Sequence, residues 1–128
     1  MLRALAISGM ALLLGLVGCS PGGGGTPAGD ATKGRALFES KQCITCHALS
    51  SVPTAQGTIG PPLNGIAKIA AARKPGMTAE AYLRESIKDP GAFLVPPFPA
   101  PSAGGMLLPV PVNDQEINDL VAFLLQQG

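Results

Sequence analysis

The chain has 128 residues and a mass of 12.9 kDa, which leaves room for one small domain and a leader. Nine Lys and Arg stand against eight Asp and Glu, and this near balance argues against nucleic-acid binding through a basic face. With no Trp, 17 Gly and 13 Pro, the domain is expected to be rich in loops. The hydrophobic core of so small a domain often needs a covalent cross-link or a bound metal group for stability.

Residues 1–18 are predicted to be a lipoprotein signal peptide. Arg3 gives the start its positive charge, and an apolar run follows from Ala4 to Val17. This run is shorter than the roughly 20 residues that a spanning helix needs. Its LVGC ending resembles the bacterial lipobox, which implies cleavage before Cys19 and attachment of a lipid to its sulfur. The alternative is an uncleaved anchor in which Cys19 is an ordinary apolar residue.

Residues 19–30 are predicted to be the lipidated cysteine and a flexible linker, because SPGGGGTPAGD has four consecutive glycines and two prolines. Both interpretations of Cys19 place residues 31–128, the folded domain, in the cell envelope. The domain is then expected at the periplasmic or outer face of the cytoplasmic membrane, held there by the anchor. Removing Arg3 with the leader leaves eight basic against eight acidic residues, so the mature polypeptide is formally neutral.

The domain opens with a predicted helix over residues 30–42, in which Leu37 and Phe38 form the apolar face. Gly34 lies four residues before Phe38 on the same side. A missing side chain at that point lets another helix approach closely, unless Gly34 is merely a tolerated residue.

Residues 43–47, CITCH, have the C-x-x-C-H pattern of covalent haem attachment. Residues three apart in a helical turn point the same way, so the thiols of Cys43 and Cys46 can reach two vinyl groups at one haem edge. His47 then offers its imidazole to the iron. A thioredoxin-type pair would need a βαβ pattern and a zinc site would need more Cys or His ligands, and the sequence has neither. We therefore predict one covalently bound haem c.

The sixth iron ligand cannot be a second imidazole, because the chain has a single histidine. Met1 and Met10 lie in the leader, which leaves Met77, Met106, another group or an open site. A His/Met pair would favour the reduced iron and raise the potential.

Two helices are predicted between the motif and a Pro-rich segment. The first spans Asn64–Arg73 and ends at Pro75-Gly76. Thr78 is expected to cap the second, whose shared face holds Tyr82, Leu83, Ser86 and Ile87 and which stops at Asp89-Pro90.

The C-terminal part combines an irregular segment with a final helix. Seven prolines between Pro90 and Pro111 exclude a helix or a central strand there. Asn113, with Glu116 three residues later, predicts a capping box. Apolar residues then follow helical spacing, namely Ile117, Leu120, Val121, Leu124 and Leu125. Phe123 lies off this stripe and is expected to meet the first helix.

Together these features resemble the class I cytochromes c over about residues 30–128. The resemblance implies an all-α fold of three to five short helices around one haem, with the Pro-rich segment as a distal loop. It implies that Met106 is the distal iron ligand. It also implies that the terminal helices cross at four positions, which correspond to Gly34, Phe38, Leu120 and Phe123.

The G-P-P-L segment at residues 60–63 resembles a segment of the same family. The resemblance implies that the Pro61 carbonyl accepts a hydrogen bond from His47 and that Leu63 packs on the haem. Residues 82–90, YLRESIKDP, resemble a segment of cytochrome c domains in respiratory complexes, including those fused to oxidase subunits. Tyr82 is then either a donor to a haem propionate or a half-buried core residue.

The expected function is electron transfer rather than enzymatic catalysis, with redox proteins as partners and no small-molecule substrate. Neutrality argues against loose electrostatic steering, so we favour a fixed subunit of a respiratory or photosynthetic membrane complex over a free carrier. The monohaem lipoprotein of alternative complex III has this general form. Phe93, Phe98 and Leu107 of the Pro-rich segment are candidates for contact with a partner. The competing hypothesis is a haem enzyme or gas sensor with an open sixth site, which would need a distal base or arginine.

Overall fold

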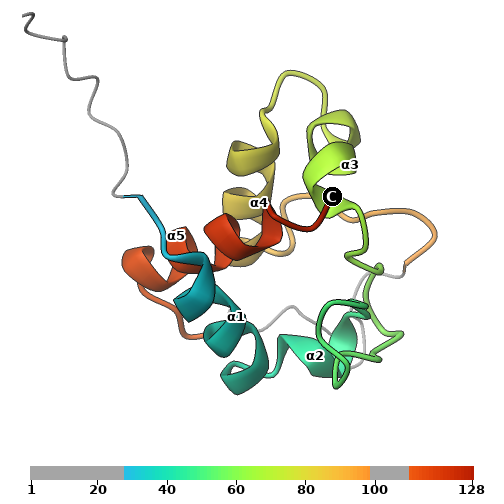
Figure 1. The fold of residues 1–128 in the computed structure, drawn as a ribbon. Coiled ribbons are helices and arrows are strands. Elements are labelled where there is room, and N and C mark those ends of the chain that lie inside the picture. Colours follow the sequence, from blue (N-terminus) through green and yellow to red (C-terminus); the bar gives the residue numbers. More distant parts are fainter. Residues whose placement is uncertain (1–27, 99–109) are drawn as a thin grey trace, which may run out of the picture.

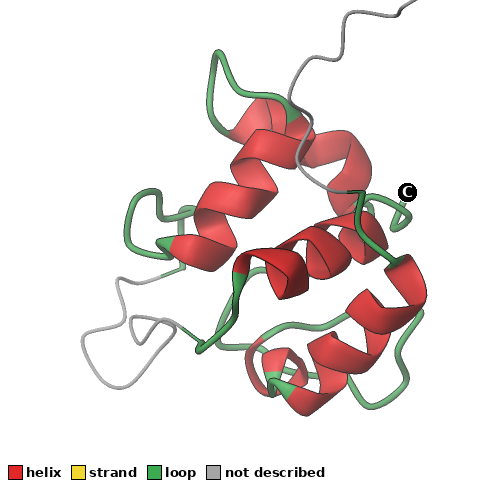
Figure 2. Ribbon diagram, turned by 90° about the vertical axis from the view of Figure 1, so that its left-hand side faces the viewer, coloured by secondary structure: helices red, strands yellow, loops and turns green. Residues whose placement is uncertain are grey.

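The computed structural model describes residues 28–98 and 110–128, so the predicted signal peptide, Cys19 and Met106 lie outside the described residues. The described part is helical, with one isolated β-bridge (Figures 1 and 2). Its elements are α1 (Ala31–Ser40), α2 (Cys43–Cys46), α3 (Ile66–Arg73), α4 (Ala79–Lys88) and α5 (Asp114–Leu124). The all-α prediction is confirmed there. None of these helices has the length and apolar character needed to cross a membrane.

Helix α1 begins where its sequence offers a cap, and it ends earlier than predicted. The Asp30 side chain accepts hydrogen bonds from the backbone N–H groups of Thr32 and Lys33. The helix stops at Ser40 because Gln42 adopts φ 63, a left-handed conformation that cannot continue a right-handed helix. The turn at Gln42 starts a separate short helix, α2, which carries both cysteines.

Helices α1 and α5 lie side by side in Figure 1 and cross at three of the four predicted positions, Gly34, Phe38 and Phe123. A Cβ on Gly34 would lie 1.9 Å from the carbonyl oxygen of Asp119, so the two backbones touch there. Next to this contact the rings of Phe38 and Phe123 are 5.7 Å apart between centroids. The expected crossing is confirmed.

Helix α5 has the predicted capping box, since Asn113 Oδ1 accepts from the Glu116 N–H and Glu116 Oε2 accepts from the Asn113 N–H. Its buried face is wider than the apolar stripe. Asp119 is buried because its carboxylate accepts the Asp30 N–H at 2.8 Å. Leu125, by contrast, is 37% exposed, because it lies past the last helical turn.

Helices α3 and α4 pack against each other, and α4 also packs against α5. Helix α3 begins two residues later than predicted, because Gly65 has φ 70 and the Asn64 side chain accepts hydrogen bonds from Ser50 instead. Helix α4 begins as predicted, with Thr78 Oγ1 accepting from the Ala81 N–H.

Candidate functional site

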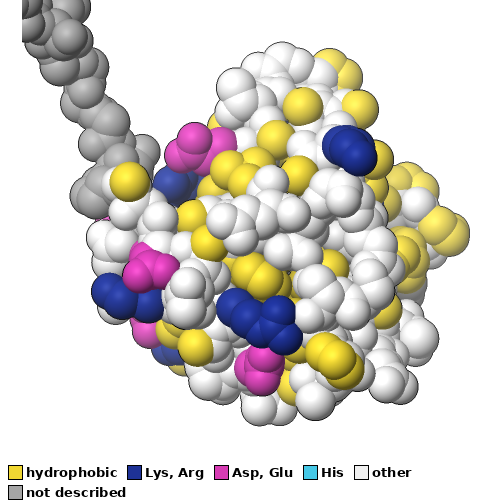
Figure 3. All heavy atoms as spheres, viewed as in Figure 1, with side chains coloured by type: hydrophobic (Ala, Val, Ile, Leu, Met, Phe, Trp, Pro, Cys, Tyr) yellow, Lys and Arg dark blue, Asp and Glu magenta, His cyan; other side chains and the backbone are white. Residues whose placement is uncertain are grey.

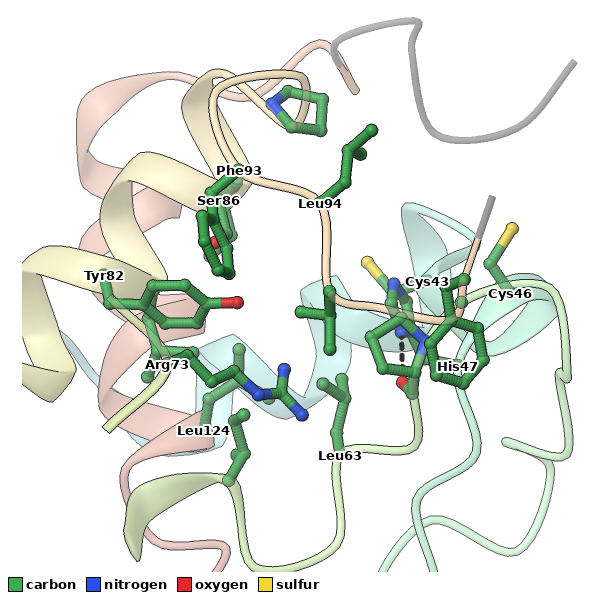
Figure 4. Close-up of a pocket in the computed structure, with 18 of the residues that line it drawn as sticks. Cys43, Cys46, His47, Leu63, Arg73, Tyr82, Ser86, Phe93, Leu94 and Leu124 are labelled. Carbon is green, nitrogen blue, oxygen red and sulfur yellow. Dashed lines mark hydrogen bonds between the residues drawn. The ribbon is translucent and has the colours of Figure 1, made fainter. Parts of the chain in front are cut away.

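One cavity receives side chains from every helix of the described part (Figure 4). The space measures about 1090 Å³, including the portion open to solvent. Most lining residues are apolar, and the three motif residues are among them. The lining comprises Phe38, Cys43, Cys46, His47, Ile59, Gly60, Pro61, Leu63, Ile66, Arg73, Tyr82, Leu83, Ser86, Ile87, Pro90, Phe93, Leu94, Val95, Phe98, Leu120 and Leu124.

The two cysteines line this cavity from a single helical turn. Helix α2 spans only Cys43 to Cys46, so they stand at its two ends, three residues apart. Both are free thiols. Burial raises the pKa of Cys43 to about 11, and the neighbouring Cys46 adds to the rise. Cys43 is therefore a protonated thiol at neutral pH.

The imidazole of His47 is 8% exposed and is held by the backbone. Its Nδ1 lies 2.7 Å from the carbonyl oxygen of Pro61. Since a carbonyl oxygen can only accept, Nδ1 carries the hydrogen and donates it, and the ring lone pair lies on Nε2. Burial lowers the pKa of His47, the Pro61 bond opposes this shift, and the charge of Arg73 lowers the pKa further. Lowering this pKa favours the neutral form, which is the form that binds a metal.

The segment that carries Pro61 is fitted closely to the motif. The Gly60 N–H donates to the Cys46 carbonyl at 2.8 Å. A Cβ on Gly60 would lie 2.5 Å from Cε1 of His47, so only glycine lets the main chain pass this close to the ring. Leu63, two residues after Pro61, is 8% exposed and lines the cavity.

The far wall of the cavity comes from α4 and the start of the Pro-rich segment. Tyr82 is 3% exposed, so it is more deeply buried than a half-buried core residue, and its ring packs edge-on against Phe93 at 6.1 Å. Phe93 and Phe98 both line the cavity. Both side chains are only partly buried, so their interpretation as contact residues for a partner stays a prediction. Leu107 lies outside the described residues.

Comparison with known proteins identifies the family. The model of the cytochrome c family matches residues 31–128. The chain belongs to the cytochrome c family. It is accordingly a haem protein of electron transfer that carries covalently bound haem c with its iron, and its small all-α fold is the class I fold.

Among solved structures, the cytochrome is similar to the crystal structure of SoxXA from P. pantotrophus. The two chains are 28% identical and superpose with a TM-score of 0.51, and the match covers 77% of this chain and 82% of that one. A search of curated proteins gave no match.

The residues of this cytochrome fit a covalently bound haem. Two free thiols, one buried imidazole with its lone pair on Nε2, and a broad apolar lining meet around one space. These are the donors that haem c uses, namely thioether sulfurs and an axial nitrogen. The Pro61 carbonyl supplies the outer partner that orients a ligating histidine.

Sequence reasoning missed one charged residue of this site, Arg73 at the end of α3. It lines the cavity, and its guanidinium carbon lies 6.0 Å from the centroid of the Tyr82 ring. The sequence carries one signal for it: Ile66, Ala70 and Arg73 follow the i, i+4, i+7 spacing and therefore share one face of the helix. The structure buries Ile66 and Ala70 fully. The apolar members of this face are few, so the pattern did not stand out.

Proposed function

We propose that this cytochrome carries one haem, is tethered to a membrane through Cys19, and passes single electrons as a subunit of a respiratory or photosynthetic membrane complex. The observation that carries the proposal is that Cys43, Cys46 and His47 line one largely apolar cavity. A single haem is supported by composition, because the chain has one histidine and one Cys-x-x-Cys pair.

In this proposal Cys43 and Cys46 form the two thioether bonds, His47 is one axial ligand through Nε2, and Met106 is the other. When bound, the haem supplies an iron that alternates between the ferric and ferrous states and exchanges one electron at a time. The Pro61 carbonyl holds the imidazole in a fixed orientation and increases its basicity. Leu63 and the apolar wall keep water away, which favours the less charged, reduced state.

The charge distribution supports a fixed place in a complex. On the face in Figure 3, most acidic and basic side chains lie next to one another rather than in separate patches. Several of them form ion pairs, such as Arg35 with Glu39 and Lys41 with Glu116. A surface of this kind, on a formally neutral mature chain, gives a distant partner little field to follow. The specific complex we propose is alternative complex III, in which this chain would be the monohaem lipoprotein subunit.

The tether would be short. The Asp30 N–H donates to Asp119, which attaches the chain to the folded domain at residue 30. A Gly-rich linker of about eleven residues has an r.m.s. span of roughly 18 Å. Lipid on Cys19 would therefore keep the haem domain close to the outer surface of the membrane, within reach of membrane-embedded redox partners.

Haem loading tests the core of the proposal. The full chain is produced in a host with a c-type maturation system, and a pyridine haemochrome assay should give one haem per chain. Cys43→Ala, Cys46→Ala and His47→Ala should each lower the yield of covalent haem protein, whereas Ser50→Ala, on the exposed side of the next turn, should load normally. A wild-type chain that carries no covalent haem would refute the proposal.

The axial ligand has its own test. The ferric protein should show the long-wavelength iron–thioether absorption band, which Met106→Ala removes and Met77→Ala preserves. Rapid binding of carbon monoxide to untreated ferrous protein would instead favour the haem enzyme or gas sensor.

Fractionation tests the tether and the complex. Cys19→Ser should move the protein from the membrane to the soluble periplasmic fraction, and the wild type should co-purify with other redox subunits after mild detergent extraction. Wild-type protein found only in the soluble fraction would contradict the membrane assignment.

A further inference from the structure

The charged residues of this cytochrome are confined to three stretches of its chain. All eight basic and eight acidic residues of the mature chain lie in residues 30–41, 68–89 and 114–119. The two stretches between them, residues 42–67 and 90–113, contain no Asp, Glu, Lys or Arg. About half of the folded domain therefore comes from stretches of chain that carry no charged residue.

The fold brings both of these uncharged stretches to the opening of the haem cavity, and most of the lining residues come from them. Ile59 belongs to the first stretch and Leu94 to the second. Both line the cavity, yet they are 56% and 39% exposed, so they lie at its opening. Cys46 also lines the cavity and is only partly buried. Ile59, Leu94 and Cys46 are called the rim below.

The rim is distinguished by both its exposure and its lack of charge. Four large apolar side chains are exposed in the described part of the chain, and two of them are Ile59 and Leu94. Among the described lining residues, Arg73 has the one permanent charge. Its guanidinium lies near the ring of the buried Tyr82, across the cavity from Cys43 (Figure 4). The rim itself is therefore apolar and uncharged.

The chemistry of the rim selects the kind of partner that can bind there. A partner with a charged docking face would lose the hydration of its charges against the rim and would find no opposite charge in return. A partner with an apolar face would instead remove Ile59 and Leu94 from water, which favours association. The cores of protein–protein interfaces are depleted of charged residues for this reason.

We propose that the rim is the docking surface for a redox protein whose own docking face is apolar and uncharged. Burial of apolar surface, rather than attraction between charges, then holds the two proteins together while an electron passes. This inference rests on the proposed haem attachment at Cys43, Cys46 and His47, and it adds the chemistry of the partner to the proposed electron transfer. The haem edge bound to Cys46 would lie next to the contact, which keeps the distance between the two cofactors short.

Electron self-exchange between ferrous and ferric copies of the haem-loaded full chain tests the rim, because a second copy presents the same apolar and uncharged surface. Cys19→Ser keeps this parent protein in solution, and NMR line broadening gives the exchange rate, which should not change with salt. Ile59→Lys places like charges in the contact and should lower the rate about tenfold at low salt. Ile69→Lys is the matched control. It adds the same charge at an isoleucine of α3 that is 42% exposed and does not line the cavity, and should keep the rate of the parent.

Opposite charges supply a check that a defect in folding cannot imitate. Ile59→Glu should also exchange slowly with itself, whereas ferrous Ile59→Lys and ferric Ile59→Glu should exchange faster with each other than either does alone. Leu94→Lys and Leu94→Glu repeat the comparison if the Ile59 variants do not load haem. Equal self-exchange rates for Ile59→Lys and Ile69→Lys, or a parent rate that changes steeply with salt, would overturn the proposal.

Further measurements separate a redox partner from other occupants of the rim. In membranes that contain the wild-type anchor, Ile59→Lys should slow reduction of the haem by the respiratory donors of the host, and Ile69→Lys should not. A stable dimer of the parent that Ile59→Lys dissociates would assign the rim to self-association. Binding of the parent to phosphatidylcholine vesicles that Ile59→Lys abolishes would assign it to lipid. Either result would overturn the proposal, whereas haem attachment would stand, since it is judged separately by the loading of the wild-type chain.

Discussion

The contact between α1 and α5 at Gly34 makes Gly34→Ala the sharpest test of the fold. The added Cβ would lie 1.9 Å from the Asp119 carbonyl oxygen and 2.7 Å from Cβ of Phe123. An ordinary contact begins at about 3.4 Å, so the helices must separate locally by about 1.5 Å. Backbone atoms of α5 cannot rotate away as a flexible side chain would, and the strain is therefore expected at the upper end of the overpacking range, about 3 kcal/mol.

The same substitution also has a favourable component. Alanine is preferred over glycine inside a helix by about 1 kcal/mol, so the expected net loss of unfolding free energy is about 2 kcal/mol. For a domain of this size, that corresponds to a fall in Tm of about 8–16 °C. The assay is thermal unfolding of the haem-loaded protein, followed by far-UV circular dichroism and by haem absorption.

Ala36→Gly is the matched control for this experiment, because Ala36 lies on the exposed side of the same helix. It should lose about 1 kcal/mol through helix propensity alone. A Gly34→Ala protein as stable as the wild type, or more stable, would refute the close crossing and the reasoning built on it.

Three further predictions concern single contacts. Gly60→Ala places a Cβ 2.5 Å from Cε1 of His47. We expect the displaced ring to change the haem absorption spectrum, and the overpacking to lower the unfolding free energy by about 1–3 kcal/mol in denaturant unfolding. An unchanged spectrum would contradict the close approach of Gly60 to the ring. Hydrogen bonds from the backbone of Asp30 and from Gln115 hold the pKa of Asp119 below its usual range. The stability that these bonds contribute is present above about pH 4 and is lost as the pH falls through the folded pKa. Asp119→Asn should therefore reduce the loss of unfolding free energy on acidification. Equal pH dependence of the unfolding free energy in the variant and the wild type would refute this. Asn113→Ala removes the cap of α5 and should lower the denaturant midpoint by the equivalent of about 1 kcal/mol at constant m, whereas a wild-type midpoint would show that the cap is dispensable.

Much of this protein is determined by signals that act within a few residues of the chain. The C-x-x-C-H spacing, the caps at Thr78 and Asn113, and the spacing of Gly34 and Phe38 each depend only on helical geometry and local hydrogen bonding. The His47–Pro61 bond spans fourteen residues. This bond was predicted from the resemblance of residues 60–63 to a family segment, because signals within a few residues do not specify a partner so far along the chain.

Other features required the assembled structure. The break between α1 and α2 at Gln42 is one of them. Gln42 adopts a left-handed conformation, and this residue type does not predict one as a glycine would. The inward turn of Phe93 and Phe98 is another, since a Pro-rich segment has no periodicity from which a buried side can be read.

Arg73 shows the division most clearly. Composition and spacing place it at the end of a short helix, where an arginine is ordinarily solvated and favoured by the helix dipole. Only the packing of α3 against α4 brings its charge over Tyr82 and into the haem cavity. The motif for covalent haem attachment therefore lies in five consecutive residues, 43–47. The charges around that motif come from elements distant in sequence, because charge acts through space rather than along the chain.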